Sequence, residues 1–141
     1  MKLDVLYKKI IEAGIEKDPR DKKEIAALLK DEKKKFDKLE ADEKKYVDEA
    51  RLWNPFADSR LLYGDSKANV KNLLVGIDIE AGEVVLADRL REKGTPIDLI
   101  ISHHPEGHAY ANFYEVMTLQ ADIFAQRGVP ISVAENLTQE R

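Results

Sequence analysis

One short apolar run in the second half of the chain constrains the fold more than any other stretch. Ile97, Leu99, Ile100 and Ile101 surround Asp98, and most of the run is β-branched. A run of this length and composition indicates a strand that is buried on both faces, as in parallel sheets covered by helices. We therefore expect an α/β fold organised around residues 97–101.

Two further segments predict that this strand belongs to a small parallel sheet. Residues 70–79 form an apolar run of strand length, and residues 129–134 form a third, shorter candidate strand. One helix fits between each two consecutive candidate strands. Strands that are joined through a helix in this way are parallel, with right-handed crossovers. The predicted fold class of residues 70–141 is α/β, with a three-stranded βαβαβ sheet.

The segments between these strands carry helical patterns. Residues 82–93 are amphipathic and are followed by Gly94, and residues 112–127 place apolar side chains at helical spacing before Gly128. Glycine commonly follows the last helical residue because it adopts the left-handed conformation at low cost. Asn112 is a candidate N-cap for the second of these helices.

A helical region is expected to precede the sheet, over residues 1–53. Apolar side chains in residues 3–13 recur at helical spacing, and Gly14 is a plausible stop. Asp18-Pro19 fits an N-cap followed by proline at the first helical position. From there the pattern continues as one long helix, or as two shorter helices with Asp42 as the second cap.

Pro55 ends the helical region, because the residue before a proline is pushed away from helical geometry. Residues 54–69 are predicted to be a loop, which leaves residues 70–141 as the sheet-bearing portion. Arg60 near Asp58 has two interpretations. The pair belongs either to an anion-binding loop or, as we favour, to a surface ion pair that holds the loop.

Composition excludes several classes of function. The net charge of −4 disfavours nonspecific binding to nucleic acid, and acidic residues flank the basic run Lys33 to Lys35. The absence of cysteine excludes disulfides and thiolate metal ligands. No apolar run approaches the roughly 20 residues that span a bilayer, and the first residues lack the apolar core of a secretion signal. We expect a cytoplasmic protein with no membrane segment.

All three histidines follow the organising strand within six positions, as His103, His104 and His108. Open α/β sheets bind ligands at the carboxyl ends of their strands, and imidazole is the commonest metal-binding side chain. The other predicted strand ends carry Asp78 and Glu135. Histidine and carboxylate ligands without thiolate suit Zn, Mn or Fe. The sequence therefore predicts a divalent metal site formed by His103, His104, Asp78 and Glu135.

Several roles within this site stay open. Successive side chains of a strand point to opposite faces. This favours two metals with one histidine each, or one histidine as ligand and the other as a hydrogen-bond donor. Asp78 is either a ligand or the cap of the next helix. His108 is a ligand, a proton shuttle or an exposed loop residue. Glu135 is a ligand or a general base, with metal-activated water as the nucleophile.

The segment from residue 76 to residue 107 resembles the Ngg-one-interacting factor three family, also known as type 2 GTP cyclohydrolase homologues. The family motif is a strand that ends in Asp-Leu, two apolar residues, Ser or Thr, and His-His-Pro. Here it reads Asp98-Leu-Ile-Ile-Ser-His-His-Pro105. The resemblance, which covers residues 70–141, implies a two-metal site with His103 and His104 on different metals. It also implies toroidal, often hexameric, oligomers.

Two departures from the family pattern affect this expectation. Thr138 stands where the family usually has an aspartate, and we expect Glu135 to compensate. A later His and Glu of the family would lie beyond Arg141. We therefore expect a fragment or N-terminal portion of a longer protein, a site completed by a second chain, or weak metal binding.

The sequence thus predicts a metal-dependent hydrolase-like protein that acts on a nucleotide or a related small molecule. The alternative is a non-enzymatic interaction or scaffold module with a structural metal site. We expect a homo-oligomer in either case. A parallel sheet of three strands has two open edges, and its faces need covering.

Overall fold

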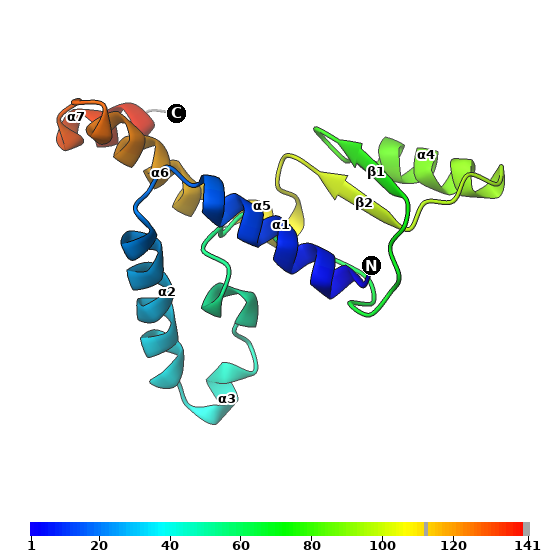
Figure 1. Cartoon of the computed structure of the whole chain (residues 1–141), viewed down its shortest axis with the longest axis horizontal. Coiled ribbons are helices and arrows are strands. Elements are labelled where there is room, and N and C mark those ends of the chain that lie inside the picture. The colour runs from blue at the N-terminus through cyan, green and yellow to red at the C-terminus, as the bar shows by residue number, and fades with distance from the viewer. Residues whose placement is uncertain (112, 140–141) are drawn as a thin grey trace.

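The structure, a computed structural model, describes residues 1–111 and 113–139. It is mostly helical, with a small sheet and α4 at one end and α6 and α7 at the other (Figure 1). The elements in chain order are α1 (Leu3–Lys17), α2 (Lys22–Asp37), α3 (Ala41–Lys44), the 3₁₀ helix η1 (Glu49–Leu52), β1 (Leu73–Gly76), α4 (Ala81–Glu92), β2 (Leu99–Ser102), α5 (Gly107–Ala111), α6 (Phe113–Gln126) and α7 (Ile131–Gln139).

The first helix is longer than predicted. The expected stop at Gly14 is wrong, because α1 continues to Lys17. Gly14 has a packing role instead: a Cβ atom there would lie 2.9 Å from Cε2 of Phe56. The glycine lets the ring of Phe56 lie directly against the helix backbone.

The start of α2 also differs from the prediction. Asp18 does not cap it; the N-cap is Asp21, whose side chain accepts a 2.7 Å hydrogen bond from the backbone N–H of Lys23. Glu24 bonds back to the backbone of Asp21, which completes a capping box. Asp18 is occupied elsewhere, since its carboxylate pairs with the guanidinium of Arg20 at 2.7 Å.

The helical pattern after α2 forms shorter pieces. Glu40, rather than the predicted Asp42, caps the short helix α3. The 3₁₀ helix η1 follows, capped by Asp48. It is joined to α2 by an ion pair of 3.3 Å between Arg51 and Glu32. Of the two alternatives, the one with more than one helix is therefore correct.

The predicted loop over residues 54–69 packs closely on α1. Asn54, only 2% exposed, donates hydrogen bonds to the hydroxyl of Tyr7 at 3.0 Å and to the carbonyl of Ser59 at 2.7 Å. The expected ion pair between Arg60 and Asp58 is not formed. The nearly buried guanidinium of Arg60 pairs with Asp48 and donates to the carbonyls of Phe56 and Ser59. An ion pair does hold the loop, but its guanidinium is buried and its acidic partner is Asp48.

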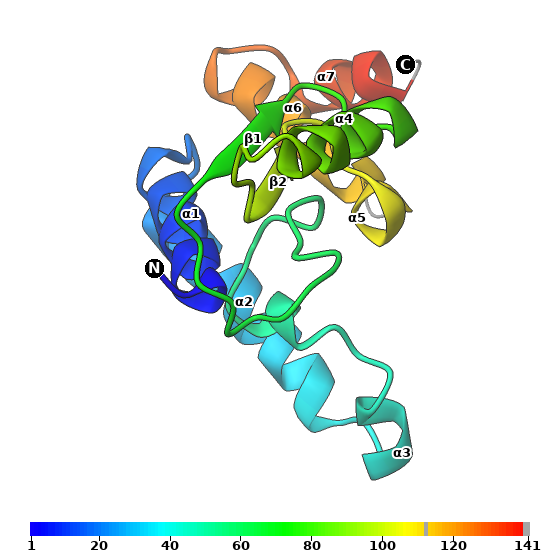
Figure 2. The same cartoon turned by 90° about the vertical axis from the view of Figure 1, so that its right-hand side faces the viewer.

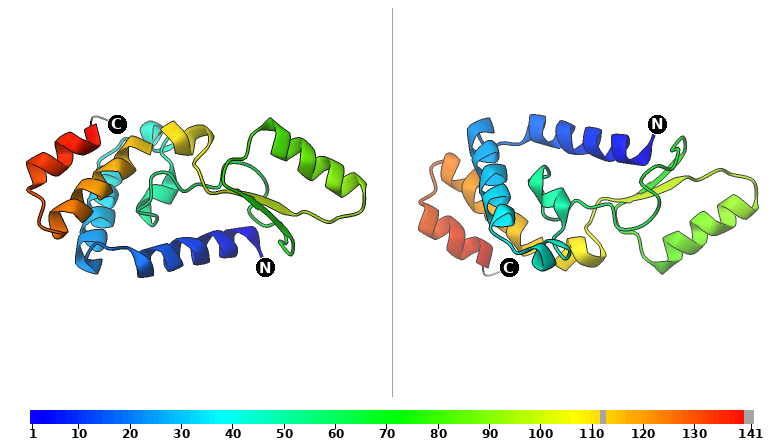
Figure 3. Two further views of the ribbon diagram at one scale, coloured as in Figure 1. Left: turned by 90° about the horizontal axis from the view of Figure 1, so that it is seen from above. Right: turned by 90° about the horizontal axis from the view of Figure 1, so that it is seen from below.

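The sheet consists of β1 and β2, which are parallel as predicted. Leu73 pairs with Leu99, and the register continues to Gly76 opposite Ser102. The helix predicted between them is confirmed as α4, and Gly94 follows it with a φ of +87°. Figures 2 and 3 show α4 beside the two strands, away from α2 and α3.

The third predicted strand is wrong. Residues 131–139 form the helix α7, which packs on α6, so the sheet in the described part of the chain has two strands. The carbonyl of Pro130 accepts hydrogen bonds from the backbone N–H groups of Val133 and Ala134, and these bonds start the helix. Gly128, with a φ of +91°, follows α6 as predicted. The predicted cap Asn112 lies outside the described residues.

The buried core is small. Its larger members are Leu3, Ile11, Ile25 and Val70, and the other buried apolar residues in the described part of the chain are alanines. Ala134 of α7 is completely buried. In the described ranges, no helix is long and apolar enough to cross a membrane.

Candidate metal site

The end of β2 positions the two adjacent histidines. Hydrogen bonds to the neighbouring strand continue beyond Ser102: the backbone N–H of His103 donates to the carbonyl of Gly76 at 2.9 Å, and that of His104 donates to Ile77 at 2.8 Å. Both histidines therefore lie at the carboxyl edge of the sheet, as predicted from the parallel arrangement.

Asp78 reaches one of these histidines from the neighbouring strand end. Its Oδ1 lies 2.7 Å from Nδ1 of His104, and both side chains are more than half exposed. With the proton on Nδ1, the ring donates to the carboxylate, and Nε2 on the opposite side of the ring is left as an acceptor. A carboxylate on one ring nitrogen is how proteins commonly orient an imidazole whose other nitrogen binds a metal.

Asp78 does not cap the following helix. The N-cap of α4 is Glu80, which forms a capping box with Glu83. The interpretation of Asp78 as a helix cap is therefore wrong, and its carboxylate is engaged by His104 instead.

His103 and His104 lie side by side. Their ring centroids are 5.2 Å apart and their planes are inclined by 34°. The expectation that they point to opposite faces is wrong, because rings this close do not lie on opposite faces, although the backbone hydrogen bonds of both residues to the neighbouring strand continue. Both residues are exposed.

The other two predicted site residues lie on helices. His108 is an exposed residue of α5, a few residues along the chain from the histidine pair. Glu135 is exposed on α7, which lies at the end of the molecule opposite the sheet (Figures 1 and 3). The structure therefore does not bring Glu135 to the histidines, and the reason is the helix that replaces the third strand.

The donor set is partial. Within residues 1–111 and 113–139, no group of three or more His, Asp or Glu side chains is placed to hold a metal ion. The chemistry of the pair fits Zn, Mn or Fe, since both are imidazoles and one is oriented by a carboxylate. A complete coordination shell would need further donors from water, substrate or another chain.

Asp98 has a structural role that sequence reasoning did not assign. Its Oδ2 accepts hydrogen bonds of 2.9 Å from the backbone N–H groups of Lys71 and Asn72, just before β1. These bonds, with that from Asn72 as the largest contribution, lower the pKa of the Asp98 carboxyl below its ordinary value. An acidic residue inside an apolar run was the signal that could have revealed this role.

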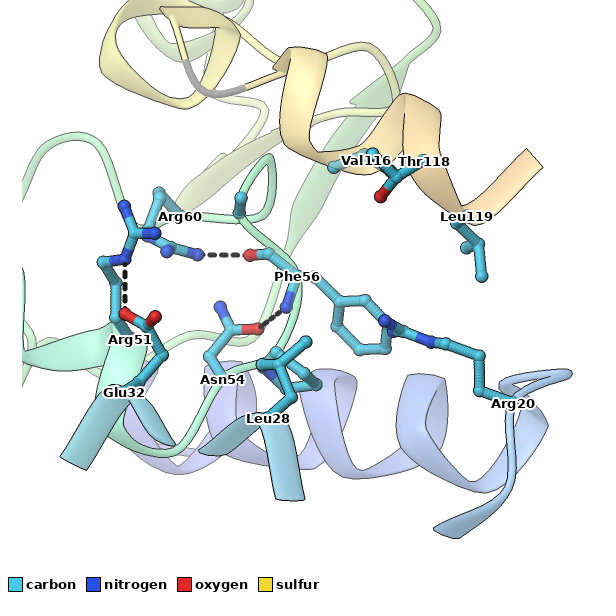
Figure 4. Close-up of a pocket in the computed structure, with 12 residues that line it drawn as sticks. Arg20, Leu28, Glu32, Arg51, Asn54, Phe56, Arg60, Val116, Thr118 and Leu119 are labelled. Atoms are coloured by element: carbon cyan, nitrogen blue, oxygen red, sulfur yellow. Dashed lines mark hydrogen bonds and ion pairs between the residues drawn. The ribbon is translucent and has the colours of Figure 1, made fainter. Parts of the chain in front are cut away.

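A separate cavity of about 130 Å³ lies between α2, the loop after η1 and α6 (Figure 4). Small-molecule sites usually have ~300 Å³ or more. The cavity is lined by three arginines, Arg20, Arg51 and Arg60, and each of them already pairs with an acidic side chain. The anion-binding interpretation of Arg60 is therefore not supported by this arrangement.

Searches against protein families, curated proteins and solved structures found no match for this chain.

Proposed function

We propose that this protein binds a divalent metal ion through His103 and His104 and acts as a metal-dependent hydrolase-like protein on a nucleotide or a related small molecule. The observation that carries the proposal is the 2.7 Å hydrogen bond between His104 and Asp78. It links two strand ends and fixes one imidazole beside a second one.

The proposal assigns a different role to each side chain. His103 and His104 are metal ligands, and Asp78 holds the ring of His104 in the tautomer that leaves Nε2 as the ligand atom. His108 on α5 is proposed as a proton shuttle. Glu135 has no part in this site because of its place on α7.

A divalent metal supplies two kinds of chemistry when it is bound: it acidifies coordinated water and polarises a carbonyl or phosphoryl oxygen. The exposure of both histidines leaves the strand ends accessible to a small-molecule substrate. The segment from Asp98 to Pro105 resembles the motif of the Ngg-one-interacting factor three family, and this resemblance supports the same type of site. Zn, Mn and Fe are the candidate metals.

Metal titration of the purified protein tests the proposal directly. We expect binding of Zn²⁺ or Mn²⁺ by calorimetry and elemental analysis. His103→Ala and His104→Ala should each weaken it by about tenfold or more, while Glu135→Ala, on α7, should leave it unchanged. The proposal would be contradicted if the purified protein held less than about a tenth of an equivalent of metal after loading, since imidazole ligands of this type bind these metals.

The partial donor set favours a second candidate function, a non-enzymatic scaffold in which the metal holds an oligomer together. The variant His103→Ala separates the two. If hydrolysis of a panel of nucleotides is lost while the assembly stays intact, the enzyme is supported. If the assembly is lost and no turnover is found in the parent protein, the scaffold is supported.

A further inference from the structure

Two aromatic side chains stack on each other shortly after the histidines in the chain. Tyr110 lies on α5, and Phe113 is the first residue of α6. Their ring centroids are 6.2 Å apart, and their planes are inclined by only 2°. Tyr110 is 65% exposed and Phe113 is 38% exposed. We call these two residues the aromatic pair. It offers an accessible, flat apolar surface of the kind on which planar rings stack.

The aromatic pair lies within reach of the candidate metal site. The helix α5 begins at Gly107, three residues after His104. Given the spacing of consecutive Cα atoms and the rise of a helix, the Cα atoms of His104 and Tyr110 are at most roughly 16 Å apart. Figures 1 and 3 show α5 next to the loop that leaves β2. A nucleotide extended from its base to its phosphates covers a comparable length.

A second segment brings another exposed aromatic side chain to the same region. A Cβ atom on Gly107 would lie 4.0 Å from Cδ1 of Leu62, so the loop after η1 lies against the first turn of α5. Tyr63 follows Leu62 and is 93% exposed. The next residue, Gly64, turns the chain with a φ of +111°. Loops on a rigid scaffold commonly carry binding residues. Exposed aromatic rings therefore approach α5 from two parts of the chain.

We propose that the aromatic pair binds the base of a nucleotide whose phosphate oxygens contact the metal at His103 and His104. This inference rests on the proposed function and deepens it, because it selects nucleotides among the possible small-molecule substrates. Every nucleobase has a flat face, and stacking on an aromatic side chain requires no particular hydrogen-bonding group. Tyr110 supplies the accessible ring, and the less exposed Phe113 holds that ring in position.

The chemistry of the two neighbouring surfaces fits this one type of ligand. A divalent metal polarises a phosphoryl oxygen and so favours the anionic end of a nucleotide. The aromatic pair is uncharged and apolar, and it favours the base at the other end. A sugar phosphate would use only the first surface, and a nucleoside only the second. A nucleotide uses both, so its affinity should exceed that of either part.

Binding of two related ligands to the Mn²⁺-loaded protein tests the inference by calorimetry. Adenosine 5′-monophosphate carries the base, whereas ribose 5-phosphate keeps the sugar and phosphate and lacks the base. We expect the parent protein to bind the nucleotide more tightly. Tyr110→Ala should weaken nucleotide binding about fivefold or more, the lower limit for one base stacked on an aromatic side chain. It should leave ribose 5-phosphate and Mn²⁺ binding unchanged.

Two further variants separate stacking from general apolar contact. Tyr110→Phe keeps a planar ring and should retain the preference for the nucleotide, whereas Tyr110→Leu keeps apolar bulk alone and should lose it. The matched control is Tyr46→Ala, since Tyr46 is 90% exposed just after α3. Circular dichroism reports whether each variant folds. The inference is overturned if Tyr110→Ala and Tyr46→Ala have equal effects, or if Tyr110→Leu keeps the preference.

Failure of the inference is distinguishable from failure of the metal site. A parent protein that binds Mn²⁺ but binds both ligands equally well would overturn base stacking and leave the metal site standing. A protein that binds no metal would contradict the proposed function. Adenosine, which has no phosphate, then still tests the aromatic pair in the metal-free protein. We expect saturable shifts of tyrosine ring signals in NMR spectra, which Tyr110→Ala abolishes; their absence in the parent protein would overturn the inference.

Discussion

His104 and Asp78 connect the ends of two neighbouring parallel strands through a single hydrogen bond of 2.7 Å between Nδ1 and Oδ1. They are 26 residues apart in the sequence, separated by α4 and β2. Both are largely exposed, so the bond contributes little to holding the fold together. Its main consequence is the orientation of the imidazole.

The first prediction concerns this orientation. Asp78→Ala should lower the affinity for Zn²⁺ by about 10–100-fold, because the ring of His104 loses the carboxylate that holds it. Folding stability should change little. Calorimetric titration measures the affinity, and Asp88→Ala, which removes an exposed carboxylate of α4, is the control. Equal affinities in the two variants would mean that Asp78 does not orient a ligand.

The second prediction concerns the pH dependence that Asp98 contributes. The folded structure lowers the pKa of its carboxyl below the ordinary value of 3.8. The stabilisation is therefore fully present above that value and is lost as the pH falls through the lower, folded pKa. We expect Asp98→Asn to have a lower Tm than the parent protein at pH 7. The difference should shrink as the pH falls below about 4. Thermal unfolding over a pH series checks this, and a constant difference would contradict it.

The third prediction concerns the buried amide between the loop and α1. Asn54→Ala should destabilise the fold by about 1–3 kcal/mol, because the backbone N–H of Phe56 loses its acceptor and the hydroxyl of Tyr7 loses its donor in a buried setting. Urea unfolding measures the change. Asn136→Ala, on the exposed side of α7, should have a much smaller effect. Similar losses for the two variants would show that burial of Asn54 is unimportant.

The fourth prediction compares two apolar side chains of α2. Ile25→Ala should cost about 2–5 kcal/mol, because Ile25 is almost completely buried and its removal leaves a cavity. Leu28→Ala should cost clearly less, since Leu28 is 38% exposed and borders the small cavity beside α6. Denaturant unfolding of both variants gives the comparison. A larger loss for Leu28→Ala would place the core of this region elsewhere.

The sequence predicted the part of the fold that depends on long, regular patterns. The apolar runs of β1 and β2 and the amphipathic pattern of α4 were sufficient for a parallel pair with one crossover. The same reasoning placed His103, His104 and Asp78 at one edge of the sheet. In each case, the spacing of apolar residues identifies the element, and the parallel direction of the strands decides which residues meet at one edge.

The errors arose where a short pattern suited two structures. Residues 129–134 alternate like a strand, yet Pro130 starts a helix, and Ala134 is buried on its inner side. A run of six residues is too short to distinguish the two-residue period of a strand from the 3.6-residue period of a helix. Glu135 was assigned to the metal site only through that strand. Asp18 likewise matched a cap, but a capping box formed three residues later at Asp21.

The contact between Gly14 and Phe56 shows how one absent carbon atom links two segments that are remote in sequence. Any larger residue at position 14 would have to displace the aromatic ring of Phe56. In related chains we therefore expect positions 14 and 56 to covary: wherever the glycine is replaced, a smaller side chain should stand in place of the phenylalanine.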